Sequence, residues 1–223
     1  MEEEVTLLRA KIEGATTKVV AHTEFIEGTI GGKEVVLARS GIGKVNAAIA
    51  TTLLLELYKP DVVLNTGSAG GFSETLEVGS VVISSEVCHH DVDVTAFGYA
   101  HGQVPQLPAT FASDHRLVQL ASEAVEAIGE HTYETGLIAS SDTFMSDPGR
   151  VEAVRKLFPM MIASEMEAAA VAQVCHQFGT PFVVIRALSD IAGKEAPMSF
   201  DEFLPIAAQH STDIVLSVIS KLS

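Results

Sequence analysis

Acidic side chains stand inside two apolar runs of this sequence. Glu165 and Glu167 flank Met166 in IASEMEAAAV, and Asp190 ends PFVVIRALSD. Loss of water disfavours an ionised carboxylate in such surroundings unless hydrogen bonds or an opposite charge compensate. Each acid alone could serve a helix N-terminus, where unpaired amides and the helix dipole favour a carboxylate. Together, acids at two neighbouring strand ends weaken that structural explanation and indicate a functional site.

A glycine-rich stretch, NTGSAGG at residues 65–71, follows the apolar segment DVVLN. Glycine lets backbone amides approach a ligand closely, and Ser68 adds a hydroxyl, although an ordinary tight turn has the same composition. The nearby SGIGK is not a Walker phosphate loop, because that pattern needs Gly at position 38 and Ser or Thr at 45, where this chain has Ala38 and Val45. GxGxxG also fails, since Asn46 occupies its third glycine position. The sequence therefore disfavours a dinucleotide site.

The segment CHHDVDV offers a possible metal site. His89, Asp91 and Asp93 would share one face of an extended segment, and imidazole and carboxylate are metal ligands. A further His or Cys cluster at a recognised spacing is missing from the sequence, and a polar loop that bonds its own backbone explains the same residues. We therefore expect neither a metal nor a cofactor.

The elements that must position these residues follow from hydrophobic periodicity. Alternating residues on both sides of Gly31 and Gly32 predict strands joined by a tight hairpin. Strands that alternate with covering helices predict one domain over residues 1–223, an α/β fold with three α/β/α layers and a central mixed β-sheet. Ligands gather at strand ends in such folds. The expected strands are 61–65, 78–87, 132–140 and 181–190, and the expected helices are 44–58, 114–129, 147–158, 165–178 and 200–220.

Composition limits the ligand and the cellular location. The 223 residues are 47% hydrophobic, enough for one large core, and the formal net charge of −15 repels nucleic acid and polyphosphate. We find neither an apolar run long enough to span a membrane nor a secretory leader. The sequence predicts a cytoplasmic protein with a neutral or zwitterionic small-molecule ligand and no nucleic-acid or membrane partner. Cys88 and Cys175 are expected to be reduced core residues.

Eight stretches along nearly the whole chain together resemble the 5′-methylthioadenosine/S-adenosylhomocysteine nucleosidase family of the nucleoside phosphorylase superfamily. The resemblance implies a nucleoside phosphorylase-like fold, a homodimer and hydrolysis of an N-glycosidic bond. The products would be adenine and a 5-thioribose sugar, as in methionine salvage and S-adenosylhomocysteine detoxification. The stretches are MEEEV, SGIGKVNAA, NTGSAGG, HDVDVTAFGY, SSDTFM, SEMEA, FVVIRALSD and SFDEF.

The same resemblance implies which residues carry the reaction. Asp190, positioned by Ser189, would donate a proton to adenine N7, because adenine leaves more easily as a neutral base. Glu4 would act as the base that activates water. Ser68 and Arg186 would help to hold that water.

The resemblance also implies the substrate contacts. Glu167 would bind the ribose hydroxyls, and Met166 would pack beside the sugar. Glu165 stays open between a substrate contact and an acid at a helix start. Phe144 would stack on adenine, and the backbone of Phe144 and Met145 would read the edge of the base. Ala69 and Gly70 would also line the site, and the 5′-alkylthio group would be enclosed by Met1, Ile42, Val94, Phe97 and Phe200, with Pro105 contributed by a second subunit.

Two alternatives belong to other functional classes. A purine nucleoside phosphorylase would use the same scaffold but needs a cationic phosphate site, and phosphorolytic relatives tend to have Arg where this chain has Asn65. A catalytically silent adenosine-binding module would be favoured by loss of the acids, which are present.

The sequence departs from the family at its N-terminus. Family members usually have a short apolar strand, ending in Gly-Ala, immediately before the MEEE stretch, whereas this sequence starts at Met1. Without a central strand, backbone groups would lack partners and Glu4 could be displaced.

Overall fold

The computed structural model describes residues 2–129, 131–193 and 200–222. Within them, β1 (Glu13–Val20), β2 (Thr23–Ile30) and β3 (Lys33–Arg39) form an antiparallel sheet in the order β1-β2-β3. The turn between β2 and β3 is Gly31–Gly32, both with positive φ, as a tight hairpin requires. The predicted hairpin is therefore confirmed.

A second, mixed sheet forms the centre of the domain. Its order is β6-β5-β7-β8-β4-β9, and β5 also pairs with β9, so the sheet curls round and closes on itself. The β4–β9, β5–β7 and β7–β8 pairs are parallel, while β4–β8 is antiparallel. The strands are β4 (Val63–Gly71), β5 (Val81–His89), β6 (Phe111–Ala112), β7 (Tyr133–Ser140), β8 (Met161–Glu165) and β9 (Phe182–Ile191).

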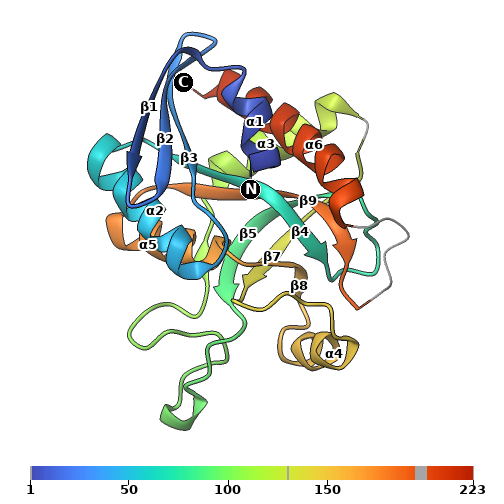
Figure 1. Cartoon of the computed structure of the whole chain (residues 1–223). Coiled ribbons are helices and arrows are strands. Elements are labelled where there is room, and N and C mark those ends of the chain that lie inside the picture. The colour runs from blue at the N-terminus through green and yellow to red at the C-terminus, as the bar shows by residue number, and fades with distance from the viewer. Residues whose placement is uncertain (1, 130, 194–199, 223) are drawn as a thin grey trace.

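Helices cover the central sheet on both faces (Figure 1). On one face lie α3 (His115–Ile128) and α6 (Phe200–Lys221), with α1 (Glu2–Arg9) against α6. On the other lies α5 (Ala168–Phe178), and α2 (Lys44–Tyr58) packs on α5. The expected α/β fold with three layers and a mixed sheet is confirmed.

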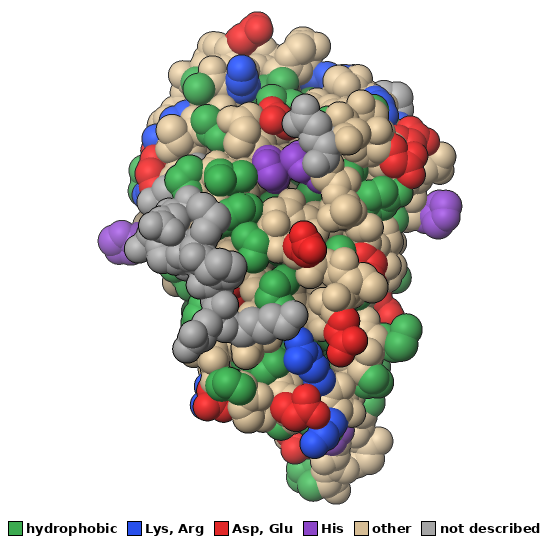
Figure 2. All heavy atoms as spheres, turned by 90° about the vertical axis from the view of Figure 1, so that its right-hand side faces the viewer, with side chains coloured by type: hydrophobic (Ala, Val, Ile, Leu, Met, Phe, Trp, Pro, Cys, Tyr) green, Lys and Arg blue, Asp and Glu red, His purple; other side chains and the backbone are tan. Residues whose placement is uncertain are grey.

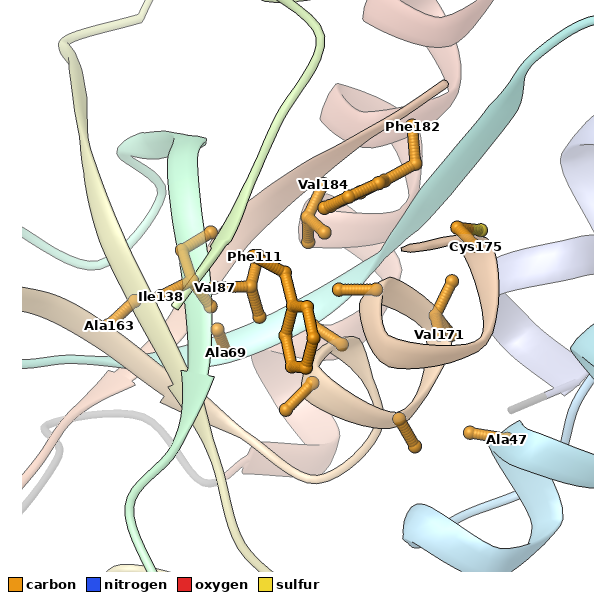
Figure 3. Close-up of a cluster of buried hydrophobic side chains, with 14 of the residues drawn as sticks. Ala47, Ala69, Val87, Phe111, Ile138, Ala163, Val171, Cys175, Phe182 and Val184 are labelled. Carbon is orange, nitrogen blue, oxygen red and sulfur yellow. The ribbon is translucent and has the colours of Figure 1, made fainter. Parts of the chain in front are cut away.

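The central strand β9 shows how the two cores arise. Side chains alternate across a strand, so Val183 and Ile185 enter the cluster beneath α3 and α6, while Phe182 and Val184 enter the cluster beneath α5. Figure 3 shows the second cluster, with Val171 of α5 facing the sheet. Because β9 is buried on both faces, its sequence is a nearly continuous apolar run.

Cys175 lies in the cluster beneath α5, and Cys88 lies in a separate buried cluster. Cys88 and Cys175 are both buried and free, as expected. Burial raises the pKa of each thiol to about 12. Neither thiol therefore provides a reactive thiolate at neutral pH.

Two local predictions are wrong. The strand expected at 61–65 is β4, which continues through Gly71, so NTGSAGG lies within the strand rather than after it. A Cβ on Gly71 would lie 2.8 Å from side-chain atoms of Leu188 and Ile191, so glycine allows β9 to approach closely. The predicted helix 165–178 begins only at Ala168, and Glu165 instead ends β8. A short buried strand and a buried helix share the same apolar pattern, which explains this error.

Local capping interactions explain where α4 begins and where α5 ends. Asp147 caps α4 (Pro148–Leu157), with Oδ1 accepting from Arg150 N at 2.7 Å, and Pro148 is the first helical residue. Gly179 ends α5 in the left-handed conformation with φ of 71°. Helix α1 was not predicted.

The described surface agrees with an acidic protein. The face in Figure 2 carries Asp and Glu side chains dispersed among apolar ones, and its Lys and Arg side chains are scattered rather than gathered into a basic patch. Such a face does not attract a polyanion strongly. In the part of the chain that the structure describes, no helix is both long and apolar enough to cross a bilayer.

A groove of about 910 Å³ lies between β3 and β4. Its walls include Val35 of β3, Leu64 of β4 and Leu8 of α1. Among the described residues β3 pairs only with β2, and β4 pairs with β8 only at Gly70 and Gly71. The groove therefore presents two strand edges whose backbone groups need hydrogen-bond partners.

We predict that an apolar strand of about seven residues, added ahead of Met1, raises thermal stability and activity together, because it can pair with both edges of the groove. Circular dichroism should show a Tm higher by about 5 °C or more. A Ser/Gly/Asn extension of equal length is the control. Equal Tm values for the two extended chains would contradict the prediction.

Candidate active site

Asp190 lies near the end of β9, opposite Gly70 of β4. The buried Ser189 donates from Oγ to Asp190 Oδ1 at 2.8 Å, and the same hydroxyl lies 3.3 Å from Ala69 O. A Cβ on Gly70 would stand 3.1 Å from Asp190 Oδ2, so glycine leaves room for the carboxyl. Burial raises the pKa of Asp190, and the Ser189 hydrogen bond offsets only part of this effect. A carboxyl that keeps its proton nearer to neutral pH is suited to act as a general acid.

Arg186, also on β9, is only 3% exposed, and acceptors face both terminal nitrogens of its guanidinium. Nη2 donates to Glu165 Oε2 at 2.6 Å and to Asn65 Oδ1 at 2.9 Å, and it lies 3.5 Å from Glu167 Oε2. Nη1 lies 3.4 Å from the carbonyl oxygen of Ser68. The guanidinium therefore joins β4, β8 and β9 and supplies the positive charge that buried carboxylates need.

Glu165 ends β8 and is 7% exposed. Its Oε1 accepts from the Ser140 hydroxyl, and its Oε2 accepts from the backbone N–H groups of Glu167 and Ala168 at 2.9 and 2.8 Å. Ser140 Oγ in turn accepts from Ala169 N at 2.7 Å. Glu165 thus satisfies the unpaired amides at the start of α5, as the helix-start interpretation requires, although it lies outside the helix.

Glu167 is the N-cap residue of α5, and it directs its own carboxylate away from that helix. Its Oε1 accepts from Gly43 N at 2.9 Å, across the gap between the α5 and α2 starts. The preceding Met166 is half-buried. Glu167 is therefore held from two sides, by Gly43 and by Arg186, close to Glu165.

Three loops approach the same corner of the sheet. Lys44, the first residue of α2, donates from Nζ to Asp91 Oδ1 at 2.6 Å and from its backbone N–H to Asp142 Oδ1 at 2.8 Å. Asp142 N donates to Asp91 Oδ2 at 3.1 Å and closes the cycle. These three residues, here called the loop latch, connect the segments 40–44, 90–94 and 141–145.

The loop latch lies next to most of the expected apolar contacts. Ile42 is 54% exposed, Phe144 is 57% exposed and Phe97, in the short 3₁₀ helix η1 (Thr95–Phe97), is 82% exposed. Val94 is half-buried, whereas Met145 is buried among core residues. Because Ile42, Phe97 and Phe144 are not packed in a hydrophobic core, their side chains are available to contact a ligand.

Pro105 is exposed on the loop between β5 and β6, which extends away from the central sheet (Figure 1). Three expected residues lie outside the described residues: Met1 as a whole, and the side chains of Glu4 in α1 and Phe200 in α6. Their roles stay predictions.

The candidate metal ligands point to different partners. His89 is buried, with Nε2 2.9 Å from Gln173 Oε1, and burial lowers its pKa. Asp91 belongs to the loop latch, and Asp93 accepts from Thr95 N and Oγ1 at 3.0 and 2.7 Å. In the described residues, no group of three His, Cys, Asp or Glu side chains could hold a metal ion.

Sequence reasoning missed two parts of this arrangement. The sequence predicts Ser140 only as the end of a strand, and it gives Lys44 and Asp142 no role of their own. Their partners lie far away along the chain, and Lys44 and Asp142 are 98 positions apart. The polar residues of SGIGK and SSDTFM at strand ends were the only signal.

Comparison with known proteins gives one consistent result. The sequence pattern of the Phosphorylase superfamily matches residues 1–220. A 5′-methylthioadenosine/S-adenosylhomocysteine nucleosidase of Lysinibacillus sphaericus is 66% identical over 222 residues, which cover 100% of this chain and 96% of the relative.

Solved structures agree. The chain is 51% identical, with a TM-score of 0.97, to a 5′-methylthioadenosine/S-adenosylhomocysteine nucleosidase from Neisseria meningitidis in complex with methylthio-immucillin-A, covering 100% of this chain and 96% of that one. It is 49% identical, with a TM-score of 0.96, to such a nucleosidase from Colwellia psychrerythraea in complex with adenine, covering 100% and 92%.

We predict that Glu165→Gln lowers the free energy of unfolding by about 3–5 kcal/mol, because it removes the buried negative charge nearest Arg186. Urea unfolding measures this change. The control is Glu152→Gln in the exposed pair with Lys156, whose charged atoms are 3.6 Å apart, where the expected change is below about 1 kcal/mol. A similar loss in both variants would contradict a special role for the buried pair.

Proposed function

This chain belongs to the phosphorylase superfamily and, within it, to the 5′-methylthioadenosine/S-adenosylhomocysteine nucleosidases, and we propose that its site hydrolyses both nucleosides with Asp190 as the acid. The reaction cleaves the N-glycosidic bond and releases adenine with methylthioribose or S-ribosylhomocysteine. The observation that carries the assignment of roles is the half-buried Asp190, with its raised pKa, on the same strand as Arg186, which holds the carboxylates of Glu165 and Glu167.

Asp190 would protonate the departing base. A protonated carboxyl donates to adenine N7, so that the base leaves as a neutral molecule rather than as an anion. Ser189 supports this role because its hydroxyl bonds Asp190 Oδ1 and thereby orients the carboxyl. Gly70 supports it by leaving open space at Oδ2.

When the N-glycosidic bond breaks, its electron pair would leave with adenine. The ribose would therefore gain positive charge. Its oxocarbenium character is stabilised by negative charge nearby, and Glu167 offers a carboxylate that Gly43 and Arg186 already hold in position. Glu167 would bind the ribose hydroxyls, with Met166 against the sugar. Glu165 would act through these contacts rather than by touching the substrate.

Water would attack the opposite side of the sugar. We assign Glu4 as the base, with Ser68 and Arg186 near the water. Arg186 is held by Glu165 and Asn65. This fixed position suits a group that orients a water molecule without moving during the reaction.

The walls of the site suit the rest of the substrate. Phe144 would stack on adenine, with the Phe144 and Met145 backbone at the base edge and Ala69 and Gly70 beside it. An apolar thioether needs apolar contacts, which Met1, Ile42, Val94, Phe97 and Phe200 would provide.

We also propose a homodimer in which Pro105 of one subunit approaches the site of the other. The exposure of Phe97 on the extended loop supports an interface there, because large apolar side chains are usually covered. The cytoplasmic location and the place of the reaction in methionine salvage and S-adenosylhomocysteine detoxification stay predictions.

Phosphorolysis is the alternative reaction on this scaffold. A phosphorylase needs cations directed at phosphate. Here Asn65 stands where phosphorolytic relatives tend to have Arg, and its Oδ1 accepts from Arg186 Nη2. This bond favours water rather than phosphate as the nucleophile.

We predict that Asp190→Asn lowers kcat by about 10²–10⁴-fold or more while inhibitor binding is mostly kept, because the amide can still hydrogen-bond but cannot deliver a proton. Adenine release measures kcat, and calorimetry with a non-hydrolysable methylthio analogue measures affinity. A kcat within a few-fold of the unmodified enzyme would remove Asp190 from the acid role.

The same variant separates function from stability. Because the folded state raises the pKa of Asp190, the carboxyl contributes its full stability below its unfolded pKa of about 3.9, and this contribution is lost as pH rises through the folded pKa. Above that pH the buried charge costs stability, which the neutral Asn does not. The Tm of Asp190→Asn at pH 8 should therefore equal or exceed that of the unmodified chain.

We predict that activity is independent of phosphate and of metal chelators. Adenine release in phosphate-free buffer should match that in buffer with phosphate, and EDTA should not change it. Adenine release that scales with phosphate and yields a sugar 1-phosphate would identify a phosphorylase. Loss of adenine release in EDTA, with recovery when metal is added, would support a metal site at His89, Asp91 and Asp93.

A further inference from the structure

The loop latch is a closed cycle of three hydrogen bonds between residues that are remote in sequence. Lys44 binds Asp91 through its ammonium group and Asp142 through its backbone, and Asp142 N binds Asp91. Every bond has a carboxylate as acceptor, and such charge-assisted bonds are stronger than neutral ones. The Lys44 and Asp91 side chains are 19% and 30% exposed, so water screens this pair only in part.

The lowered pKa of Asp91 agrees with strong hydrogen bonds in the loop latch. Burial by itself would raise the pKa of Asp91. The hydrogen bonds from Lys44 Nζ and Asp142 N, together with the Lys44 charge, nevertheless hold the pKa below its usual range. Asp91 is therefore ionised at neutral pH, and all three bonds of the cycle are available.

Each segment joined by the loop latch carries one side of the proposed substrate pocket. Ile42 precedes Lys44, Val94 and Phe97 follow Asp91, and Phe144 follows Asp142. Ile42, Phe97 and Phe144 are more than half exposed, so packing into a core does not fix their positions. Hydrogen bonds between the segments themselves can hold them in place.

The loop latch is also coupled to an acid of the site. Gly43, immediately before Lys44, donates its N–H to Glu167 Oε1 at 2.9 Å. A Cβ on Gly43 would lie 3.2 Å from Asp142 Oδ1, so the segment 40–44 lies close to both carboxylates. Movement of Lys44 would therefore disturb the hydrogen bond that holds Glu167.

We propose that Lys44, Asp91 and Asp142 are positioning residues that assemble the three walls of the substrate pocket before the nucleoside binds. The proposal rests on the proposed function, since it concerns the same site. When the loop latch is broken, only a fraction of molecules has all three walls in place, and apparent affinity falls by that fraction. Once substrate is bound, the walls are in place and the chemical step proceeds nearly as before.

The test compares steady-state kinetics of methylthioadenosine hydrolysis in Lys44→Met and Asp91→Asn. Each should raise KM about tenfold, as expected if about one molecule in ten keeps the walls assembled, while kcat changes less than about twofold. Because both changes break the same cycle, the double variant should be little worse than either single one. Lys44→Arg keeps the charge and should restore KM to near that of the unmodified enzyme.

Matched controls separate positioning from general stability. Lys156→Met breaks the exposed pair with Glu152 and should leave KM unchanged. If Lys44→Met does not fold, Asp91→Asn alone decides, since Asn keeps the size of Asp. A KM within twofold of the unmodified enzyme, or a loss confined to kcat, overturns the proposal. An unmodified enzyme that releases no adenine would instead overturn the proposed function.

Discussion

The buried ion pair between Arg186 and Glu165 is the interaction on which the site depends. Two charges removed from water are tolerated only when they meet each other and when hydrogen bonds satisfy their remaining atoms. Here the carboxylate also accepts from Ser140 and from two backbone amides, and the guanidinium also reaches Asn65. One pair thus fixes β4, β8, β9 and the start of α5 relative to one another.

This constraint explains why the acids of the site have different chemistry. Glu165 lies among donors that include a cation, whereas the described hydrogen-bond partner of Asp190 is the Ser189 hydroxyl. Burial consequently raises the pKa of Asp190. Neighbouring carboxyl groups with unlike surroundings can divide the work between a proton donor and charge stabilisation.

The rigid centre contrasts with the loops around it. Small residues of β4 let β9 approach closely, and β9 is buried from Phe182 to Ser189, a stretch that includes Arg186 and leads to Asp190. The ligand-facing side chains Ile42 and Phe144 lie on exposed segments that are joined to the rest by polar contacts. A packed sheet positions the reacting groups, while adaptable loops enclose the substrate.

Local chemistry in the sequence was enough to predict the hairpin at Gly31–Gly32, the end of α5 at Phe178 and the alternation of strands with helices. The acids in apolar runs also indicated the position of the site, and the family resemblance named their roles. Sequence did not separate the strand β8 from the helix that follows it, because a buried strand and a buried helix have similar composition. Nor did it pair Arg186 with Glu165, Ser140 with Ala169, or Lys44 with Asp142. Those contacts join residues that are remote along the chain, and only the closing of the sheet brings them within hydrogen-bond distance.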